Sequence, residues 1–266
     1  MGARCMTVVA IVVAVTGAGC DRMVDDVPPP PHATGPVIRT ERGTATPYGA
    51  GAEQVWVLRP RAGETTSVVV YLHGYGAYLP FEWHLEWMDH LLQGGSTVLF
   101  PRYQPGLDDP FVLTPFDLAE GLRTGFGAIG YDGQPVVAAG FSLGATLALV
   151  YAARAGEWGV PPPKAVYSVF PVDPILVDVG VDLSTIENTQ VLVLAGDRDD
   201  VVGREGPREA FAGLTGLPGT LKELRTIVTT DELFADHEAP TLVDDPVVRD
   251  TFWKPLDALV QASRGR

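Results

Sequence analysis

The chain has 266 residues, of which 46% are hydrophobic and 20% charged, and this composition is ordinary for a globular protein with a core and suits one large α/β domain. Its formal net charge of −14 repels phosphate, so we expect no nucleic-acid partner and no basic patch for anionic lipid. Both cysteines, Cys5 and Cys20, lie close to the N-terminus, which excludes a disulfide or a cysteine-ligated metal in the rest of the chain.

The N-terminus has the pattern of a secretory signal. Arg4 precedes an uncharged run over residues 5–20, which is shorter than the roughly 20 residues that a membrane span needs. Small residues over 16–19 then lead into Cys20, and this ending resembles a bacterial lipobox, in which the cysteine is lipidated and becomes the first residue of the mature protein. The resemblance implies an exported protein held by a lipid anchor on the outer face of a bacterial cell membrane. An ordinary signal peptide on a secreted protein, or an uncleaved anchor, is the alternative.

A proline-rich segment follows the signal. Residues 21–45 include an unbroken proline run over 28–31, and such a run is extended, semi-rigid and unable to join a sheet. We therefore predict a signal peptide over residues 1–20, a linker over 21–45 and one folded domain over 46–266.

From residue 53 the apolar pattern alternates between short strands and longer helices. We predict strands over 54–58, 67–72, 97–100, 135–139, 165–170, 191–195 and 224–228. Helices are expected over 81–92, from Thr114 past Phe126, over 145–154, and over 247–262 with a kink or split at Pro255. This alternation implies a mostly parallel sheet with helices on both faces, whose ligands bind at the carboxyl ends of the strands.

A G-x-S-x-G motif spans residues 140–144, between a predicted strand and a predicted helix. The sharp turn would expose the Ser142 hydroxyl above the sheet, where the N–H of Leu143 can donate to an oxyanion. We interpret Ser142 as a nucleophile; a capping serine in a glycine-rich turn is the alternative.

With this motif the chain resembles the α/β-hydrolase family over roughly residues 50–264. The resemblance implies an α/β-hydrolase fold, and the short stretch between Asp173 and Val191 leaves no room for a large lid. Residues 72–76, LHGYG, follow a buried strand and resemble the family's oxyanion loop, which maps the second oxyanion donor onto the backbone N–H of Tyr75. His73 is then a structural residue of that loop.

The acid and the base of a catalytic triad follow in the family's order. Residues 195–202 resemble the family's G-x-x-D turn, which maps the acid onto Asp199; Asp173, Asp197 and Asp200 are the alternatives. Serine needs a base to remove its proton, and His237 is the histidine that follows both the serine and the acid. A surface histidine in an acidic loop is the alternative there.

Three aromatic residues after the oxyanion motif, Tyr78, Phe81 and Trp83, either form an apolar substrate pocket or pack the first helix. The spacing of His84, Glu86 and His90 matches no zinc motif, so we interpret them as surface residues of that helix and expect no metal.

These residues predict a serine hydrolase that cleaves carboxylic esters or lipids through an acyl-enzyme, with no organic cofactor. In size the chain resembles small lidless esterases of the cutinase and dienelactone-hydrolase kind. An acyltransferase, thioesterase or peptidase on the same triad is one alternative, and a non-catalytic surface-binding lipoprotein is the other.

Overall fold

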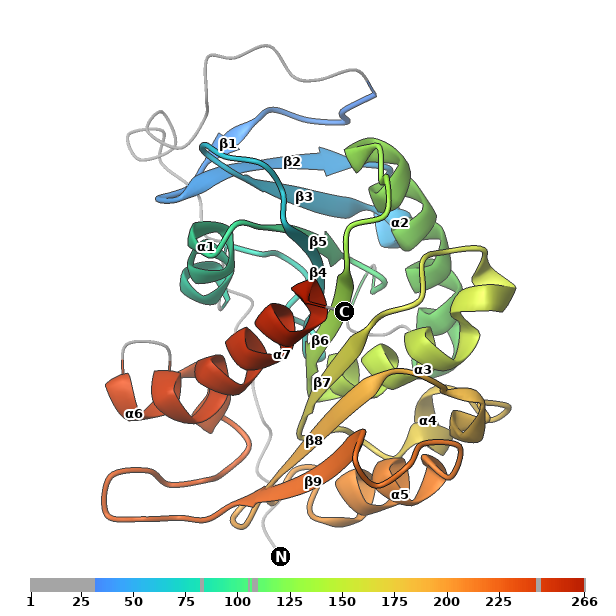
Figure 1. Ribbon diagram of the computed structural model, residues 1–266, viewed down its shortest axis with the longest axis vertical. Coiled ribbons are helices and arrows are strands. Elements are labelled where there is room, and N and C mark those ends of the chain that lie inside the picture. The colour runs from blue at the N-terminus through green and yellow to red at the C-terminus, as the bar shows by residue number, and fades with distance from the viewer. Residues whose placement is uncertain (1–31, 82–83, 105, 107–109, 243–244, 266) are drawn as a thin grey trace, which may run out of the picture.

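The computed structural model describes residues 32–81, 84–104, 106, 110–242 and 245–265 (Figure 1). The predicted signal peptide with Cys20, the proline run and Trp83 lie outside the described residues. Within the described ranges, no helix combines the length and the apolar character that a membrane span requires.

A nine-stranded sheet forms the centre of the molecule, in the order β1-β2-β3-β5-β4-β6-β7-β8-β9 (Figure 1). The strands are β1 (Ile38–Arg39), β2 (Gly43–Tyr48), β3 (Val55–Pro60), β4 (Ser67–Leu72), β5 (Ser96–Pro101), β6 (Val136–Phe141), β7 (Ala165–Val169), β8 (Gln190–Gly196) and β9 (Lys222–Ile227). The first three pair antiparallel, β3 is also antiparallel to β5, and all pairs from β5 to β9 are parallel. The mostly parallel sheet predicted from the alternation is confirmed.

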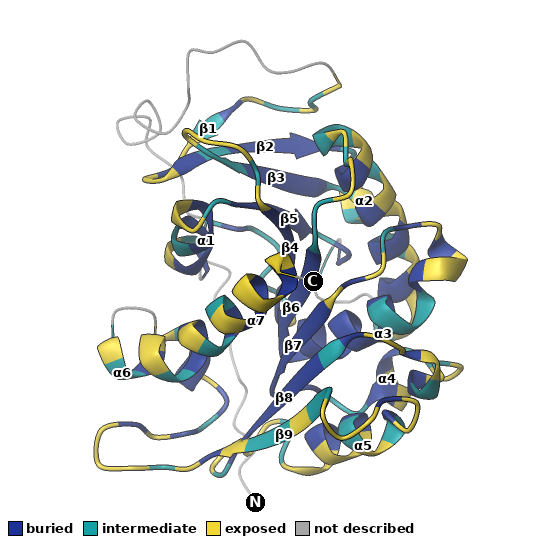
Figure 2. Cartoon of the chain, viewed as in Figure 1, coloured by how far each residue is buried: buried dark blue, intermediate teal, exposed yellow. Residues whose placement is uncertain are grey.

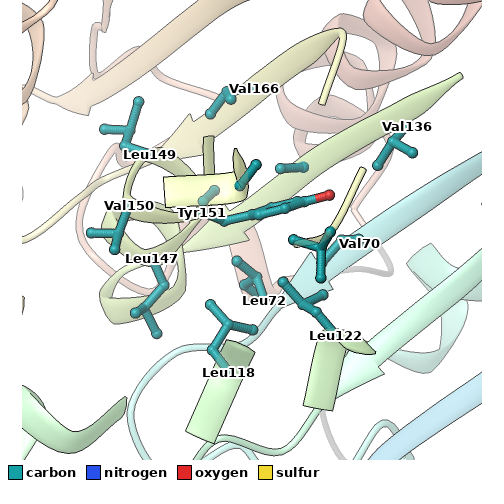
Figure 3. Packing of buried hydrophobic residues seen from close by; sticks show 14 of the residues in the cluster. Val70, Leu72, Leu118, Leu122, Val136, Leu147, Leu149, Val150, Tyr151 and Val166 are labelled. Atoms are coloured by element: carbon teal, nitrogen blue, oxygen red, sulfur yellow. The ribbon is translucent and has the colours of Figure 1, made fainter. Parts of the chain in front are cut away.

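Helices cover both faces of this sheet. They are α1 (Leu85–Gln93), α2 (Thr114–Ile129), α3 (Leu143–Trp158), α4 (Pro174–Val177), α5 (Glu205–Gly213), α6 (Pro246–Val248) and α7 (Lys254–Arg264). Apolar residues of α2 and α3 belong to one buried cluster, and those of α1 and α7 to another on the opposite face. Figure 3 shows part of the first cluster, which contains Leu118 and Leu122 of α2, Leu147 and Tyr151 of α3, and Val70 and Leu72 of β4.

The central strand β4 is buried on both faces, which explains its apolar sequence. Val70 and Leu72 pack in the cluster with α2 and α3, whereas Val69 and Tyr71 pack in the cluster with α1 and α7. Because successive side chains point to opposite faces, a strand covered on both sides must be apolar at every position. The dark core of Figure 2 runs along β4, β6 and β7 accordingly.

The sheet starts earlier than the predicted domain boundary at residue 46. β1 lies wholly inside the predicted linker, and β2 crosses the boundary and pairs with β3 along its length. The sequence of β2, GTATPY, hid this strand, because glycine and proline are depleted from strands and its apolar residues are few.

Helix boundaries also differ from the prediction in places. α1 begins at Leu85 rather than residue 81, and α5 was not predicted because Gly206 and Pro207 open it. Proline in a first helical turn costs no internal hydrogen bond, so the helix forms despite these residues. The C-terminal helix is divided as expected: a π-helical turn over Arg249–Trp253 precedes α7, which has Pro255 in its first turn.

Candidate active site

The turn between β6 and α3 places Ser142 at the carboxyl edge of the sheet. Ser142 has φ 56° and ψ −121°, a backbone conformation that L-residues rarely adopt. Its N–H donates to Val169 O of the adjacent strand at 2.9 Å, which holds the strained turn in place. The hydroxyl is therefore fixed at the N-terminus of α3 by backbone geometry.

Both glycines of the G-x-S-x-G motif are required by close backbone contacts. A Cβ atom on Gly140 would lie 2.1 Å from Gly144 O, and one on Gly144 would lie 2.1 Å from Leu72 O. No real Cβ atom comes so close to a backbone oxygen, so only glycine fits at either position. The start of α3 is thus packed directly against the end of β6 and the end of β4.

Ser142, His237 and Asp199 form a continuous hydrogen-bonded line. His237 Nε2 lies 3.0 Å from Ser142 Oγ, and His237 Nδ1 lies 2.8 Å from Asp199 Oδ2. All three residues are buried, with exposed fractions of 8%, 6% and 8% for Ser142, His237 and Asp199. The structure brings together the three residues that the sequence assigned to the triad.

The environment of Asp199 keeps its carboxylate ionised. Burial raises the pKa of this group, but hydrogen bonds from His237 and from the N–H groups of Val202 and Val201 outweigh burial and leave the pKa below its ordinary value. An ionised carboxylate can hold the Nδ1 proton of His237 and leave Nε2 free to accept the serine proton.

The alternative acids have other partners. Asp173 Oδ1 accepts from Ile175 N at 3.1 Å and caps α4, while Asp197 Oδ1 accepts from the backbone N–H and the hydroxyl of Thr229. Asp200 is exposed in the turn after β8. Asp199 is therefore the aspartate of this region whose side chain bonds His237.

The oxyanion loop lies beside the nucleophile. A Cβ atom on Gly74 would lie 3.5 Å from Ser142 Cβ, so the loop that carries Tyr75 N–H borders the serine. Leu143 N–H begins α3 directly after Ser142. These backbone N–H groups are the two predicted oxyanion donors, and both belong to segments that meet at Ser142.

A segment that sequence reasoning missed, residues 102–104 after β5, holds this loop. The ring of His73 stacks on Tyr103 with centroids 4.1 Å apart, and His73 Nε2 lies 2.8 Å from Arg102 O. Tyr103 Oη donates to His73 O, and the buried Gln104 accepts from Gly76 N at 2.8 Å through Oε1. Burial lowers the pKa of His73 to about 4, so its ring is neutral at pH 7 and has the structural role expected for it.

The sequence pattern that could have indicated this segment is Tyr103 and Gln104, which follow β5, the parallel neighbour of β4. Because parallel neighbours end at the same edge of a sheet, residues after β5 must come near residues after β4. Only the strand order, which the sequence did not provide, identifies the pairing.

A cavity of about 430 Å³ opens above Ser142 and His237. Its walls come from residues 74–77 of the oxyanion loop, His84, Phe141, Val201, Glu238 and Thr241. This volume falls within the range of small-molecule sites. A larger cavity, of about 700 Å³, lies between β9 and α7, and its lining includes none of the triad residues.

The predicted aromatic pocket is corrected by this lining. Phe81 packs edge-on against Trp56, with ring centroids 5.0 Å apart, and the ring of Tyr78 lies 4.9 Å from the Arg102 guanidinium. Neither belongs to the cavity wall, and their rings lie instead against side chains of β3 and of the segment after β5. The sequence pattern did not show these contacts, because they depend on the order of the strands.

His84 is also not the surface residue that we predicted. It is 2% exposed, its Nδ1 lies 3.2 Å from Tyr71 Oη, and it lines the cavity. Glu86 and His90 lie elsewhere on α1, and His90 bonds Asp257. In the described part of the chain, no cluster of three or more His, Cys, Asp or Glu side chains could hold a metal.

Comparison with known proteins gives similarity at the level of structure. No family model and no curated protein matches this chain in sequence. A carboxyl esterase from Tuber melanosporum superposes with a TM-score of 0.64 over 85% of this chain and 89% of its own, at 14% identity. An esterase/lipase from an uncultured bacterium gives 0.63 over 85% and 87% of the two chains, also at 14% identity.

A third solved structure, an esterase from Pyrobaculum calidifontis, is 18% identical and superposes with a TM-score of 0.61 over 87% of this chain and 83% of its own. This chain has the α/β-hydrolase fold. In such a sheet, ligands bind at the carboxyl edge of the parallel strands. Here the oxyanion loop follows β4, Ser142 follows β6, Asp199 follows β8 and His237 follows β9, so all four meet at that edge.

Proposed function

We propose that this α/β-hydrolase is a carboxylic ester hydrolase that works through an acyl-enzyme on Ser142. The observation that carries the proposal is the unbroken line from Ser142 Oγ through the His237 ring to Asp199, with distances of 3.0 and 2.8 Å. A structural serine needs neither a histidine at hydrogen-bond distance nor a carboxylate behind that histidine.

The first half of the reaction forms the acyl-enzyme. His237 Nε2 takes the proton of Ser142 as Oγ attacks the ester carbonyl carbon, and Asp199 stabilises the imidazolium that forms. The N–H groups of Tyr75 and Leu143 donate to the oxyanion. The imidazolium then gives its proton to the leaving alcohol, and the carbon–oxygen bond of the ester breaks.

The second half releases the acid. A water molecule gives its proton to His237 Nε2 and attacks the acyl carbonyl, the same N–H groups hold the second oxyanion, and Ser142 leaves with the proton that returns from His237. The net reaction converts ester and water into acid and alcohol, with no change of oxidation state.

The choice of an ester as substrate is supported by the cavity and by the names of similar structures. A cavity of about 430 Å³ suits a small ester rather than a folded polypeptide. Solved structures that superpose on this chain include one named a carboxyl esterase and one named an esterase/lipase, each 14% identical to it. Acyl transfer, thioester cleavage and peptide cleavage use the same triad and remain outcomes of the test.

The test is hydrolysis of p-nitrophenyl esters from acetate to palmitate by the full-length protein, beside Ser142→Ala. Loss of the serine is expected to lower kcat by about 10⁵-fold or more. Labelling by a fluorophosphonate without ester turnover would move the assignment to a thioester, a peptide or an acyl acceptor. If the folded protein shows no labelling and no turnover, that result would favour a non-catalytic binding lipoprotein.

We propose further that the protein is exported and lipid-anchored through Cys20. The support is the sequence pattern alone: an apolar stretch, small residues before the cysteine and a proline-rich segment after it. Mass spectrometry of the membrane fraction tests this, because a diacylglyceryl-modified Cys20 is expected at the mature N-terminus. An unmodified Cys20 within the mature chain would contradict it.

A further inference from the structure

The large hydrophobic side chains that are exposed to solvent share one edge of the sheet. Among the described residues, each of them lies in a segment that leads away from the carboxyl end of a parallel strand: one after β4, three after β5, three after β7, one after β8 and three after β9. Ser142 follows β6 at the same edge. Single exposed hydrophobic residues scattered over a surface need no explanation, but their concentration around one site indicates a surface that binds something apolar.

The catalytic cavity is connected to this exposed apolar surface by direct contacts. Two of the exposed residues, Tyr75 and Val201, belong to the cavity wall. The ring of Tyr75 packs edge-on against Phe111, with centroids 5.4 Å apart, and Phe111 opens the short 3-10 turn that also holds Val112 and Leu113. This turn contacts α4. Apolar side chains therefore lead from the cavity wall outward to α4.

The outer part of this surface, at the start of α2 and on and after α4, is the most exposed. Phe116 is 71% exposed and Val179 is 75% exposed, and both line one groove of about 240 Å³. We call the exposed large hydrophobic residues of these two segments the apolar rim, which consists of Val112, Leu113, Phe116, Ile175, Leu176 and Val179.

The charged side chains near the apolar rim favour an uncharged partner. Arg154, which borders the same groove, is paired with Asp178 and Glu157. Near the cavity the exposed Glu238 and Asp200 add negative charge, on a chain whose formal net charge is −14. An anionic surface would be repelled, whereas an uncharged apolar surface would not.

We propose that the apolar rim docks on the surface of an aggregated, uncharged ester, so that this hydrolase works at a lipid–water interface and takes its substrate from that surface into the catalytic cavity. The inference rests on the proposed ester hydrolysis and names the physical state of the substrate of that same site. An interface that removes the rim from water stabilises the bound protein roughly in proportion to the apolar area buried. A second copy of this chain on the rim would crowd the cavity, whereas an ester surface supplies the molecule that must enter there.

The experiment measures hydrolysis of glycerol tripropionate by the full-length protein as the ester concentration passes its solubility limit. The quantity compared is the ratio of the rate above the limit, where droplets form, to the rate just below it. Every variant keeps the same N-terminal segment, so the contribution of that segment at the droplet surface is common to all. The wild-type ratio is expected to be about ten, which corresponds to about 1.4 kcal/mol in favour of the interface.

In Phe116→Gln/Val179→Gln the ratio should fall towards one while the rate on dissolved ester stays unchanged, because neither residue belongs to the triad, the oxyanion loop or the cavity wall. Phe116→Leu keeps an apolar side chain and should keep most of the ratio. The matched control is Ala62→Gln, which introduces the same side chain at an exposed position before β4, at the opposite edge of the sheet, and its ratio should equal that of the wild type.

The inference is overturned if the wild-type rate does not rise across the solubility limit, or if the double variant keeps the wild-type ratio. A wild-type dimer that the double variant dissociates, seen by light scattering, also overturns it, because a second copy then covers the rim. If the double variant is inactive on dissolved ester as well, Val179→Gln alone decides by the same ratio. A wild-type protein that hydrolyses neither dissolved nor aggregated ester would contradict the proposed function itself, whereas hydrolysis with a ratio indifferent to the rim contradicts this inference alone.

Discussion

The two walls of the active site are built in different ways. On one wall, Ser142 is positioned by direct backbone contacts, since Gly140 packs against Gly144 O and Gly144 packs against Leu72 O. On the other wall, the oxyanion loop is held by residues about thirty positions further along the chain, chiefly Tyr103 and Gln104. The motif of the nucleophile is thus contiguous in the sequence and held by backbone contacts, whereas the oxyanion loop is held by side chains of another segment.

The difference indicates where each wall is vulnerable. The serine turn depends on atoms that no distant substitution can move far, because β4, β6 and α3 meet there in direct backbone contact. The loop depends on a few hydrogen bonds from another segment, so changes remote from the chemistry should weaken catalysis in a graded way.

The largest effect is expected on the triad wall. Asp199→Asn removes the negative charge that stabilises the His237 imidazolium and replaces a carboxylate oxygen, which accepts the Nδ1 proton, by an amide. We therefore expect kcat to fall by about 10⁴-fold with little change in the fold. The matched control is Asp173→Asn, because asparagine also caps a helix N-terminus and Asp173 caps α4 away from His237. Ester hydrolysis by both variants gives the answer, and equal losses would contradict the assignment of Asp199.

A smaller, graded effect is expected on the oxyanion wall. Gln104→Leu removes the acceptor for Gly76 N–H, so the neighbouring Tyr75 N–H loses its support and kcat should fall about tenfold while KM changes little. The same substitution at Gln134, whose side chain lies in the turn before β6, should leave kcat unchanged. A wild-type kcat in Gln104→Leu would show that the loop holds its shape without the distant segment.

The smallest effect concerns stability at low pH. Burial lowers the pKa of His84 to about 3 and that of His73 to about 4, below the ordinary value near 6.5. Between those values the unfolded chain binds protons that the folded protein does not, so stability is fully present above pH about 6.5 and is lost as pH falls. Each histidine should cost about 1 kcal/mol between pH about 6.5 and 5.5.

Urea unfolding of His84→Gln over this pH interval measures the contribution of one ring. The variant should lose about 1 kcal/mol less than the wild type on acidification. An equal loss in both proteins would mean that His84 is not held neutral by burial.

Most of the fold could be predicted from the sequence, for identifiable reasons. Strands covered on both faces, such as β4 and β6, are continuous apolar runs, and helices such as α2 have an apolar face and a recognisable first turn. β2 and α5 were missed because each contains glycine and proline in positions that the structure tolerates but the pattern penalises.

The triad could be predicted because its chemistry demands particular residue types in a particular chain order. The burial of His84 could not, since it depends on tertiary contacts such as the bond between Tyr71 of β4 and one of its ring nitrogens. A histidine before a helix has the same sequence pattern whether its ring faces water or the protein interior.

The close backbone contacts of Gly140 and Gly144 also have a genetic consequence. Every missense change of a glycine codon adds at least a Cβ atom, and at these two positions that atom would lie 2.1 Å from a backbone oxygen that cannot retreat. In a library covering all single substitutions, these two codons should therefore admit synonymous changes alone among active clones.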